Sequence, residues 1–186
     1  MIHVVTGGSG SGKSEYAEQL AVNLGEFPRI YVAAMMVWDD EGRARVKRHR
    51  DMRRHKGFET VERYTDLQNL ELPPGTHFVK NPPVVLLECM SNLVSNEFYK
   101  QGERTAEAVI KGIESLNKKC KSLIIVTNEV FSDGENYGAE TMQYIEVLGE
   151  VNRYLGKTAD SVTEVVYGIP VQIRPPTTWE RDLQIK

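Results

Sequence analysis

Residues 7–14 read Gly-Gly-Ser-Gly-Ser-Gly-Lys-Ser and fit the pattern G-x-x-x-x-G-K-[ST]. An apolar run over residues 2–6 precedes the motif, and residues 15–24 place apolar side chains at helical spacing after it. In this strand–loop–helix context, glycines let backbone N–H groups wrap around a polyphosphate, and the helix N-terminus adds partial positive charge. The motif therefore predicts a nucleotide-binding loop rather than a flexible Gly/Ser turn.

The motif also predicts individual contacts. Lys13 is expected against the β- and γ-phosphates, where it serves catalysis, and the Ser14 hydroxyl is expected to hold Mg²⁺. The predicted nucleotide contacts of the loop are Gly7, Gly8, Ser9, Gly10, Ser11, Gly12, Lys13 and Ser14.

Short apolar segments alternate with helical patterns along the rest of the chain. Because several of these segments lack polar alternation, we expect strands covered on both faces, as in a parallel sheet with right-handed crossovers. The last two are close enough to form an antiparallel edge hairpin around Gly168-Ile169-Pro170. The predicted strands are Ile2–Thr6, Ile30–Ala34, Val84–Leu87, Leu123–Thr127, Val162–Val166 and Val171–Ile173, and the predicted helices are Glu15–Leu24, Arg43–Lys56, Thr105–Asn117 and Met142–Leu155.

The fold class expected from this pattern is α/β: a mostly parallel, twisted sheet flanked by helices, in one domain over residues 1–174 with a tail over 175–186. The net charge of −3 argues against a non-specific nucleic-acid binder. The apolar runs are far shorter than the roughly 20 residues that span a bilayer, and residues 1–5 carry no basic leader. With only Cys89 and Cys120, no disulfide framework is expected. We therefore expect a cytoplasmic protein.

A second acidic or polar group must meet the metal beside such a loop. Glu88 ends the apolar run Val84–Leu87, and a carboxylate there is costly to bury without a cation. We therefore predict Glu88 as a Mg²⁺ site residue together with Ser14. The alternative is an ordinary strand-terminal glutamate exposed to water. Cys89, which follows it, is expected to pack rather than react.

The segment from Arg43 to Lys56 is strongly basic and has few apolar positions. As a helix, it places Arg45, His49, Arg53 and Lys56 on one stripe, which suits an anion, although charge runs are usually solvated faces. Neighbouring cations disfavour the imidazolium form, so His49 is expected to be neutral at pH 7 and able to attack phosphorus.

The chain resembles the bifunctional adenosylcobinamide kinase/adenosylcobinamide-phosphate guanylyltransferases. The resemblance extends from residue 1 to about 174, and two blocks are its most specific part: Arg45-Val46 with His49, and Thr127-Asn128-Glu129-Val130. Further matching blocks are Thr6-Gly7-Gly8, Tyr31-Val32-Ala33, Thr60-Val61-Glu62, Leu86-Leu87-Glu88-Cys89, Ala159-Asp160 and Gly168-Ile169-Pro170.

The resemblance implies a RecA-like P-loop fold and two successive reactions. The family phosphorylates the hydroxyl of the aminopropanol side arm of adenosylcobinamide with ATP or GTP, then transfers GMP from GTP onto that phosphate through a guanylated histidine, giving adenosylcobinamide-GDP and pyrophosphate. By motif position that histidine is His49. The resemblance also implies a corrinoid substrate and a homo-oligomer, with a trimer as the expected form. The guanine-nucleotide contacts it implies beyond the loop are Ala34, Met35, Met36, Arg50, Asp51, Met52, Arg53, Glu62 and Glu88.

The sequence departs from the family pattern at Ala34-Met35-Met36, at Gly42 and over residues 131–137. Two other functions remain open at this point. One is a P-loop kinase of another small alcohol or nucleotide, with His49 only structural and no covalent adduct. The other is a nucleotide-binding protein without turnover, for which the altered segment over residues 131–137 would be a signature.

Overall fold

The computed structural model describes residues 1–37, 40–74, 81–130 and 137–176. At residues 41–43, 45, 48, 49, 52 and 103 it describes the backbone only. The strands are β1 (Ile2–Thr6), β2 (Arg29–Ala33), β3 (Phe58–Glu62), β4 (Val84–Glu88), β5 (Ser122–Val126), β6 (Ser161–Val166) and β7 (Ile169–Arg174). The helices are α1 (Lys13–Asn23), α2 (Asp40–Arg53), α3 (Met90–Gln101), α4 (Thr105–Asn117) and α5 (Ala139–Thr158), with the 3-10 turns η1 (Leu67–Asn69) and η2 (Gly102–Arg104).

The strands form one sheet in the order β3-β2-β4-β5-β1-β6-β7. Every neighbouring pair is parallel except β6 and β7, which form an antiparallel hairpin. The carboxyl ends of β1, β4 and β5 therefore meet at one edge of the sheet, where open α/β sheets bind ligands. The predicted α/β class, mostly parallel sheet and antiparallel edge hairpin are confirmed.

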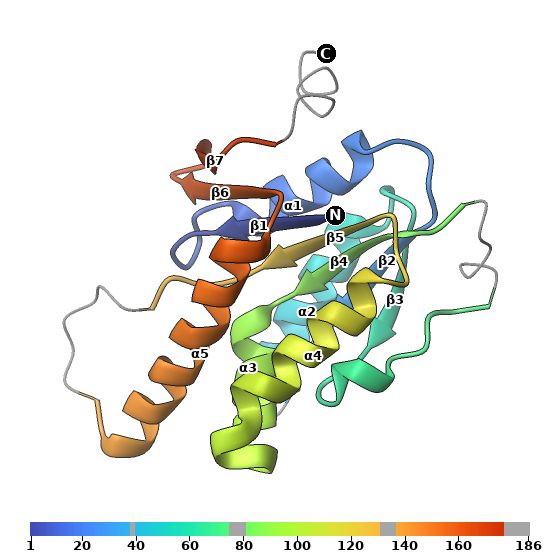
Figure 1. The fold of residues 1–186 in the computed structure, drawn as a ribbon. Helices are drawn as coiled ribbons and strands as arrows, with labels where there is room; N and C mark the ends of the chain where they lie inside the picture. Colours follow the sequence, from blue (N-terminus) through green and yellow to red (C-terminus); the bar gives the residue numbers. More distant parts are fainter. Residues whose placement is uncertain (38–39, 75–80, 131–136, 177–186) are drawn as a thin grey trace.

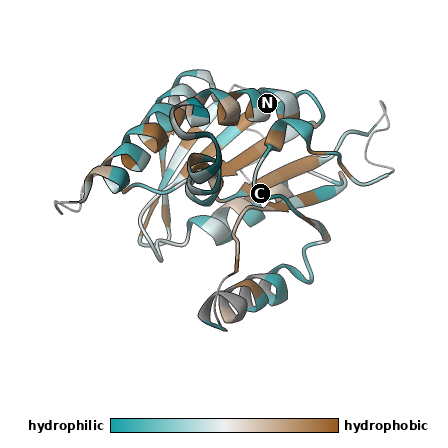
Figure 2. Cartoon of the chain, turned by 90° about the horizontal axis from the view of Figure 1, so that it is seen from below, coloured by the Kyte–Doolittle hydropathy of each residue, from teal (hydrophilic) through white to brown (hydrophobic). Residues whose placement is uncertain are grey.

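Helices cover both faces of the sheet (Figure 1). On one face, Ala17 and Ala21 of α1 pack against Tyr31, Leu86 and neighbouring strand residues. On the other face, α3, α4 and α5 cover a larger cluster. Apart from Glu88 at the end of β4 and Ser122 at the start of β5, these two strands are apolar because both of their faces are buried, and Figure 2 shows the resulting apolar ribbon at the centre of the molecule.

The basic helix α2 lacks the apolar stripe that holds the other helices. Among its described side chains, Arg53 is buried and Val46 is half-buried, whereas Asp40, Lys47 and Arg50 are exposed. Figure 2 shows this helix projecting from the body of the molecule, connected to β2 by a more apolar segment. Among the side chains of α2 that the structure describes, Arg53 at its end is thus the one that is buried against the body of the molecule.

The structure corrects several predicted elements. β3 and α3 were not predicted, and Ile169 and Pro170 belong to β7 rather than to the turn, which is formed at Tyr167-Gly168. The basic helix ends at Arg53, so Lys56 lies beyond it. The predicted tail lies outside the described residues from 177 onward, and the domain boundary at 174 stays a prediction. In the part of the chain that the structure describes, no helix has the length and apolarity needed to cross a membrane.

Candidate active site

The glycine-rich motif forms a loop between β1 and α1, as the sequence predicts. Gly12 adopts φ 91°, and its carbonyl oxygen accepts the hydrogen bond of the Tyr16 amide in the first turn of α1. A Cβ on Gly7 would lie 2.5 Å from the carbonyl oxygen of Val165, so only glycine allows β6 to pass this close. The loop is also fastened to the β6–β7 turn, because the Gly168 amide donates to the Ser11 carbonyl oxygen at 2.8 Å.

Lys13 lies inside the loop. Its Nζ donates to the carbonyl oxygen of Gly8 at 2.9 Å, and its side chain is buried. Burial lowers the pKa of Lys13, while the negative charges of Cys89 and Glu88 in their ionised forms act in the opposite direction. A bound phosphate offers this ammonium group a stronger partner than a neutral carbonyl.

Ser14 and Glu88 meet across the loop. The Ser14 hydroxyl donates to Oε1 of Glu88, and the Tyr31 hydroxyl donates to Oε2 of the same carboxylate at 3.1 Å. Desolvation, followed by the charge of Glu88, raises the pKa of Tyr31, so its hydroxyl stays a neutral donor. Glu88 is half-buried, and the alternative of a water-exposed strand-terminal glutamate is wrong.

This arrangement fits a magnesium ion. Mg²⁺ binds oxygen atoms and often takes only one or two carboxylates, completing its shell with water and substrate phosphates. A hydroxyl and a carboxylate oxygen already in contact, beside a loop that suits phosphates, supply that donor set. Among the described residues, no group of three or more His, Cys, Asp or Glu side chains forms an alternative metal site.

The end of α2 docks on the same region through charged groups. The Arg53 guanidinium carbon lies 3.4 Å from the centre of the Tyr31 ring, and Nη1 lies 3.8 Å from Oε1 of Glu18. Lys56 Nζ lies 2.7 Å from the other oxygen of Glu18, which is buried on α1. The stripe that the sequence predicts to face an anion therefore ends, at Arg53 and Lys56, on a carboxylate of the protein itself.

His49 and Arg45 lie on α2, but their side chains, like that of Met52, are outside the described part of the structure. Their backbone positions put them on the projecting helix, N-terminal to the Arg53 anchor. The structure thus gives the helix that carries His49 and the point where that helix is attached.

The other residues predicted to contact the nucleotide fall into two groups. Ala34 is buried directly after β2, with its amide donating to the Glu88 carbonyl oxygen at 3.0 Å, and the half-buried Met35 and Met36 follow it. Arg50 lies on α2 with Nη2 3.4 Å from Oε1 of Glu62 at the end of β3, and Asp51 is exposed beside it. The first group lies next to Glu88 and its partners Ser14 and Tyr31. The second group lies on the edge strand β3 and on the projecting helix α2.

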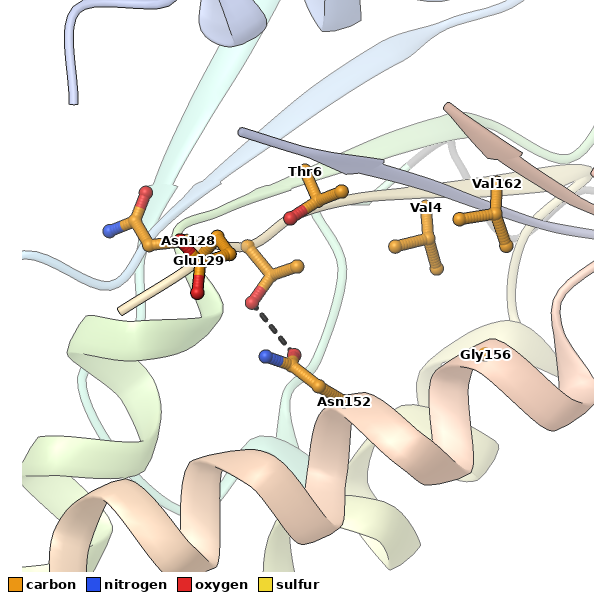
Figure 3. A pocket seen from close by; sticks show the side chains of 8 residues that line it. Val4, Thr6, Asn128, Glu129, Asn152, Gly156 and Val162 are labelled. Carbon is orange, nitrogen blue, oxygen red and sulfur yellow. Dashed lines mark hydrogen bonds between the residues drawn. The ribbon is translucent and has the colours of Figure 1, made fainter. Parts of the chain in front are cut away.

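A cavity of about 130 Å³ opens on the other face of the sheet edge, between the ends of β1 and β5 and helix α5 (Figure 3). Sequence reasoning did not single it out. It is lined by Val4, Thr6, Thr127, Asn128, Glu129, Asn152, Gly156 and Val162.

Sequence reasoning also missed Tyr31 and Glu18 as parts of the site. Both are ordinary core positions in a one-dimensional pattern: a tyrosine in an apolar strand and a glutamate in an amphipathic helix. The sequence offers one clue to them: each places a polar group at a position that is buried, Tyr31 in β2 and Glu18 next to Ala17 in α1. Such a group requires a partner, but the sequence does not say which one.

Residues 3–173 match the model of the family described as cobinamide kinase / cobinamide phosphate guanyltransferase. The chain is 33% identical to the bifunctional adenosylcobalamin biosynthesis protein CobU of Escherichia coli, over 94% of this chain and 100% of that protein. It is 31% identical to the CobU protein of Salmonella typhimurium, again over 94% of this chain and all of that protein. Among solved structures, the flagellar accessory protein FlaH from Methanocaldococcus jannaschii is similar with a TM-score of 0.47 and 10% identity, over 94% of this chain and 78% of that one.

Proposed function

The chain belongs to the cobinamide kinase / cobinamide phosphate guanyltransferase family, and from this premise we propose how its residues carry out the two reactions. The protein is a nucleotide-binding transferase of adenosylcobalamin biosynthesis, with adenosylcobinamide kinase and adenosylcobinamide-phosphate guanylyltransferase activity. The observation that carries the mechanism is the meeting of Lys13, Ser14 and Glu88 at the phosphate loop.

In the kinase reaction, the loop N–H groups and Lys13 hold the β- and γ-phosphates of ATP or GTP. The hydroxyl oxygen of the corrinoid side arm bonds to the γ-phosphorus and its proton passes to solvent, while the bond from that phosphorus to the β-phosphate oxygen breaks and ADP or GDP leaves. Negative charge on the transferring group is stabilised by the loop N–H groups and by Lys13, which exchanges the Gly8 carbonyl oxygen for a phosphate oxygen when the nucleotide binds. Lys13 is buried, which strengthens its interaction with a phosphate.

Ser14 and Glu88 would hold Mg²⁺, with Tyr31 fixing the second oxygen of the carboxylate. The ion, when bound, supplies positive charge to the phosphate oxygens and lowers their mutual repulsion. Because Tyr31 donates to Oε2, the Glu88 carboxylate is oriented with Oε1 toward Ser14 before any ligand arrives.

In the guanylyl reaction, a ring nitrogen of His49 attacks the α-phosphorus of GTP. The bond between the α-phosphorus and the bridging oxygen breaks, and pyrophosphate leaves. An oxygen of the corrinoid phosphate then attacks the same phosphorus and displaces His49, giving adenosylcobinamide-GDP. A covalent intermediate divides the transfer into two steps, so two large anionic substrates need not meet in one transition state.

The position of His49 on a projecting helix supports this role. A helix attached mainly through Arg53 can turn about that point and bring His49 to the triphosphate. Arg45, Arg50 and Arg53 would then lie near the phosphates, and Asp51, Met52 and Glu62 beside the nucleotide. Ala34, Met35 and Met36, which follow β2 next to Glu88, would contact the nucleotide from the sheet side.

The protein is also proposed to work as a homo-oligomer, with a trimer as the expected form, in the cytoplasm where GTP is available. The support for an oligomer is β7, whose apolar residues Ile169, Val171 and Ile173 are 65%, 44% and 60% exposed. Gln172 turns toward Tyr16 of α1, so Ile169 and Val171 share the opposite face of β7, and Ile173 follows where the register with β6 shifts. An exposed apolar stripe on an edge strand favours association with another chain.

The kinase proposal is tested with Lys13→Ala. The substitution removes the cation aimed at the transferring phosphate, so kcat for phosphorylation of adenosylcobinamide should fall by about 10²–10³-fold or more. Lys111→Ala, which removes an exposed lysine on α4, is the matched control and should leave kcat unchanged. Near-normal turnover in the Lys13 variant would contradict the assignment of the loop.

A further inference from the structure

The cavity between β1, β5 and α5 lies beside the phosphate loop but on the opposite side of the sheet edge. Thr6, in its wall, directly precedes Gly7 of the loop. The Thr127 amide donates to the Val5 carbonyl oxygen at 2.9 Å, so the ends of the two strands are joined where the cavity begins. A group seated in this cavity would therefore approach the phosphates from the sheet edge.

The size of the cavity restricts what it can hold. A cavity of about 150 Å³ accommodates benzene, which has six heavy atoms. A volume of about 130 Å³ therefore suits a fragment of about five heavy atoms and excludes a nucleobase with its sugar. The cavity can take a short arm of a large substrate, while the rest of that substrate stays outside.

The cavity is lined by apolar side chains on one side and by hydrogen-bonding side chains on the other. Val4 and Val162 form the apolar part, and the Thr127 hydroxyl donates to Oδ1 of Asn152 at 2.8 Å (Figure 3). With its oxygen engaged in this way, Asn152 keeps its NH₂ group as a hydrogen-bond donor in the wall of the cavity, and no described residue accepts from it. Glu129 brings a carboxylate to the exposed rim. Asn128 points away, where its side-chain amide donates to Ser91.

These groups match a small hydroxyalkyl amide. The Asn152 NH₂ group can donate to a carbonyl or hydroxyl oxygen, the Glu129 carboxylate can accept from an N–H or O–H, and a methyl group fits between the valines. A phosphate is a poor occupant because the lining contains no cation and one carboxylate.

We propose that this cavity is the acceptor subsite, which seats the aminopropanol arm of the corrinoid and leaves the corrin ring at the surface. The arm has three carbons, one nitrogen and one oxygen, in agreement with the volume. Its hydroxyl would point toward the phosphate loop past Thr6. This inference rests on the proposed function, since it assigns the place from which the alcohol of the kinase reaction approaches.

The test fills the cavity from its helical wall. Gly156 lies one helical turn after Asn152, and a Cβ built on it has no atom within 4 Å. Gly156→Leu should therefore occupy the cavity without displacing the backbone, and replacing glycine inside a helix favours folding. Arg153→Leu places the same side chain on the exposed side of α5 as a control.

With adenosylcobinamide as the varied substrate, Gly156→Leu should raise its KM at least tenfold, and Arg153→Leu should not change it. Binding of a fluorescent GTP analogue and labelling of the protein by GTP alone should stay within twofold of wild type. Asn152→Ala, which opens the cavity but removes the donor, should also raise the KM for adenosylcobinamide, by about tenfold.

Each outcome decides the proposal. An unchanged KM in both cavity variants, or an equal loss of GTP binding, would overturn the acceptor subsite while wild-type turnover still supports the proposed function. If wild type does not phosphorylate adenosylcobinamide, the proposed function fails and this assignment fails with it. Should Gly156→Leu not fold, Asn152→Ala alone decides.

Discussion

At the scale of single residues, the site depends on a few polar side chains in contact with one another. Lys13, Ser14 and Glu88 could be predicted from the sequence because each has a fixed place in a motif or at a strand end. Tyr31 could not, since its function comes from the pairing of β2 with β4, which brings its hydroxyl to Glu88. The sequence shows a tyrosine in an apolar run but not the register that gives it this partner.

Tyr31→Phe tests whether this hydroxyl orients the metal carboxylate. Outer groups that hold a metal ligand typically contribute 10–100-fold to metal affinity or activity. We expect the Mg²⁺ concentration for half-maximal kinase activity to rise by about tenfold or more. Tyr154→Phe is the control. It removes a hydroxyl of α5 that donates a hydrogen bond to Glu114 of α4, outside the site, and should leave the Mg²⁺ dependence unchanged. An identical Mg²⁺ curve for both variants would refute this role of Tyr31.

His3 makes stability depend on pH although it lies outside the site. Its Nδ1 contacts the Ser161 hydroxyl at 2.9 Å, and burial lowers its pKa from 6.5 to about 4. The folded state therefore favours the neutral ring, so this stability is present above pH 6.5 and is lost as the pH falls. Between pH 7.5 and 5, protonation of His3 should lower the free energy of unfolding by about 2 kcal/mol. In urea titrations, the free energy of unfolding of the His3→Gln variant should decrease less over this pH range than that of wild type. Equal decreases in the two proteins would exclude His3 as the cause.

At the scale of elements, apolar patterning predicted most of the sheet and failed where burial was partial. β4 and β5 are apolar except for Glu88 and Ser122 at one end of each strand, and they were predicted at nearly their observed positions. β3 was missed because its exposed residues Glu59 and Glu62 interrupt the apolar pattern on an edge strand. The projecting helix α2 was predicted from charge alone, but its anchor was not, since that anchor is the distant carboxylate Glu18 of α1.

Glu18→Gln tests this anchor. It leaves the buried Arg53 and the partly buried Lys56 without their anion, and breaking a buried ion pair from one side costs about 3–5 kcal/mol. We expect the free energy of unfolding to fall by about 3 kcal/mol in urea titrations. Glu15→Gln, an exposed change on the same helix, is the control and should have little effect. A loss below about 1 kcal/mol for Glu18→Gln would show that α2 is held by other contacts.

At the scale of the whole molecule, the topology gathers the carboxyl ends of β1, β4 and β5 at one edge, with the phosphate loop on one side and the cavity on the other. The parallel class could be predicted because doubly buried strands alternate with helices. The strand order could not, because it depends on which crossover each connection takes. The same topology leaves β7 as an edge strand with exposed apolar residues.

Replacing Ile169 and Ile173 together by lysine tests the proposed oligomer. Two charges among the exposed apolar residues of β7 would have to be buried on association, so the variant should elute as a monomer while wild type elutes as an oligomer. Light scattering coupled to size-exclusion chromatography gives both masses. Lys118 and Lys121 changed together to glutamine would be the control. A monomeric wild type, or a variant with unchanged mass, would exclude β7 as the interface.

The most direct test of the whole account is the intact mass of the protein after incubation with GTP and Mg²⁺. We expect an added GMP that maps to the peptide containing His49, is lost in acid and is absent in His49→Ala, with His55→Ala as the control that keeps the adduct. Transfer of this GMP to adenosylcobinamide phosphate should restore the original mass. A wild-type protein that turns over GTP without any such adduct, or an adduct that persists in His49→Ala, would contradict the proposed mechanism.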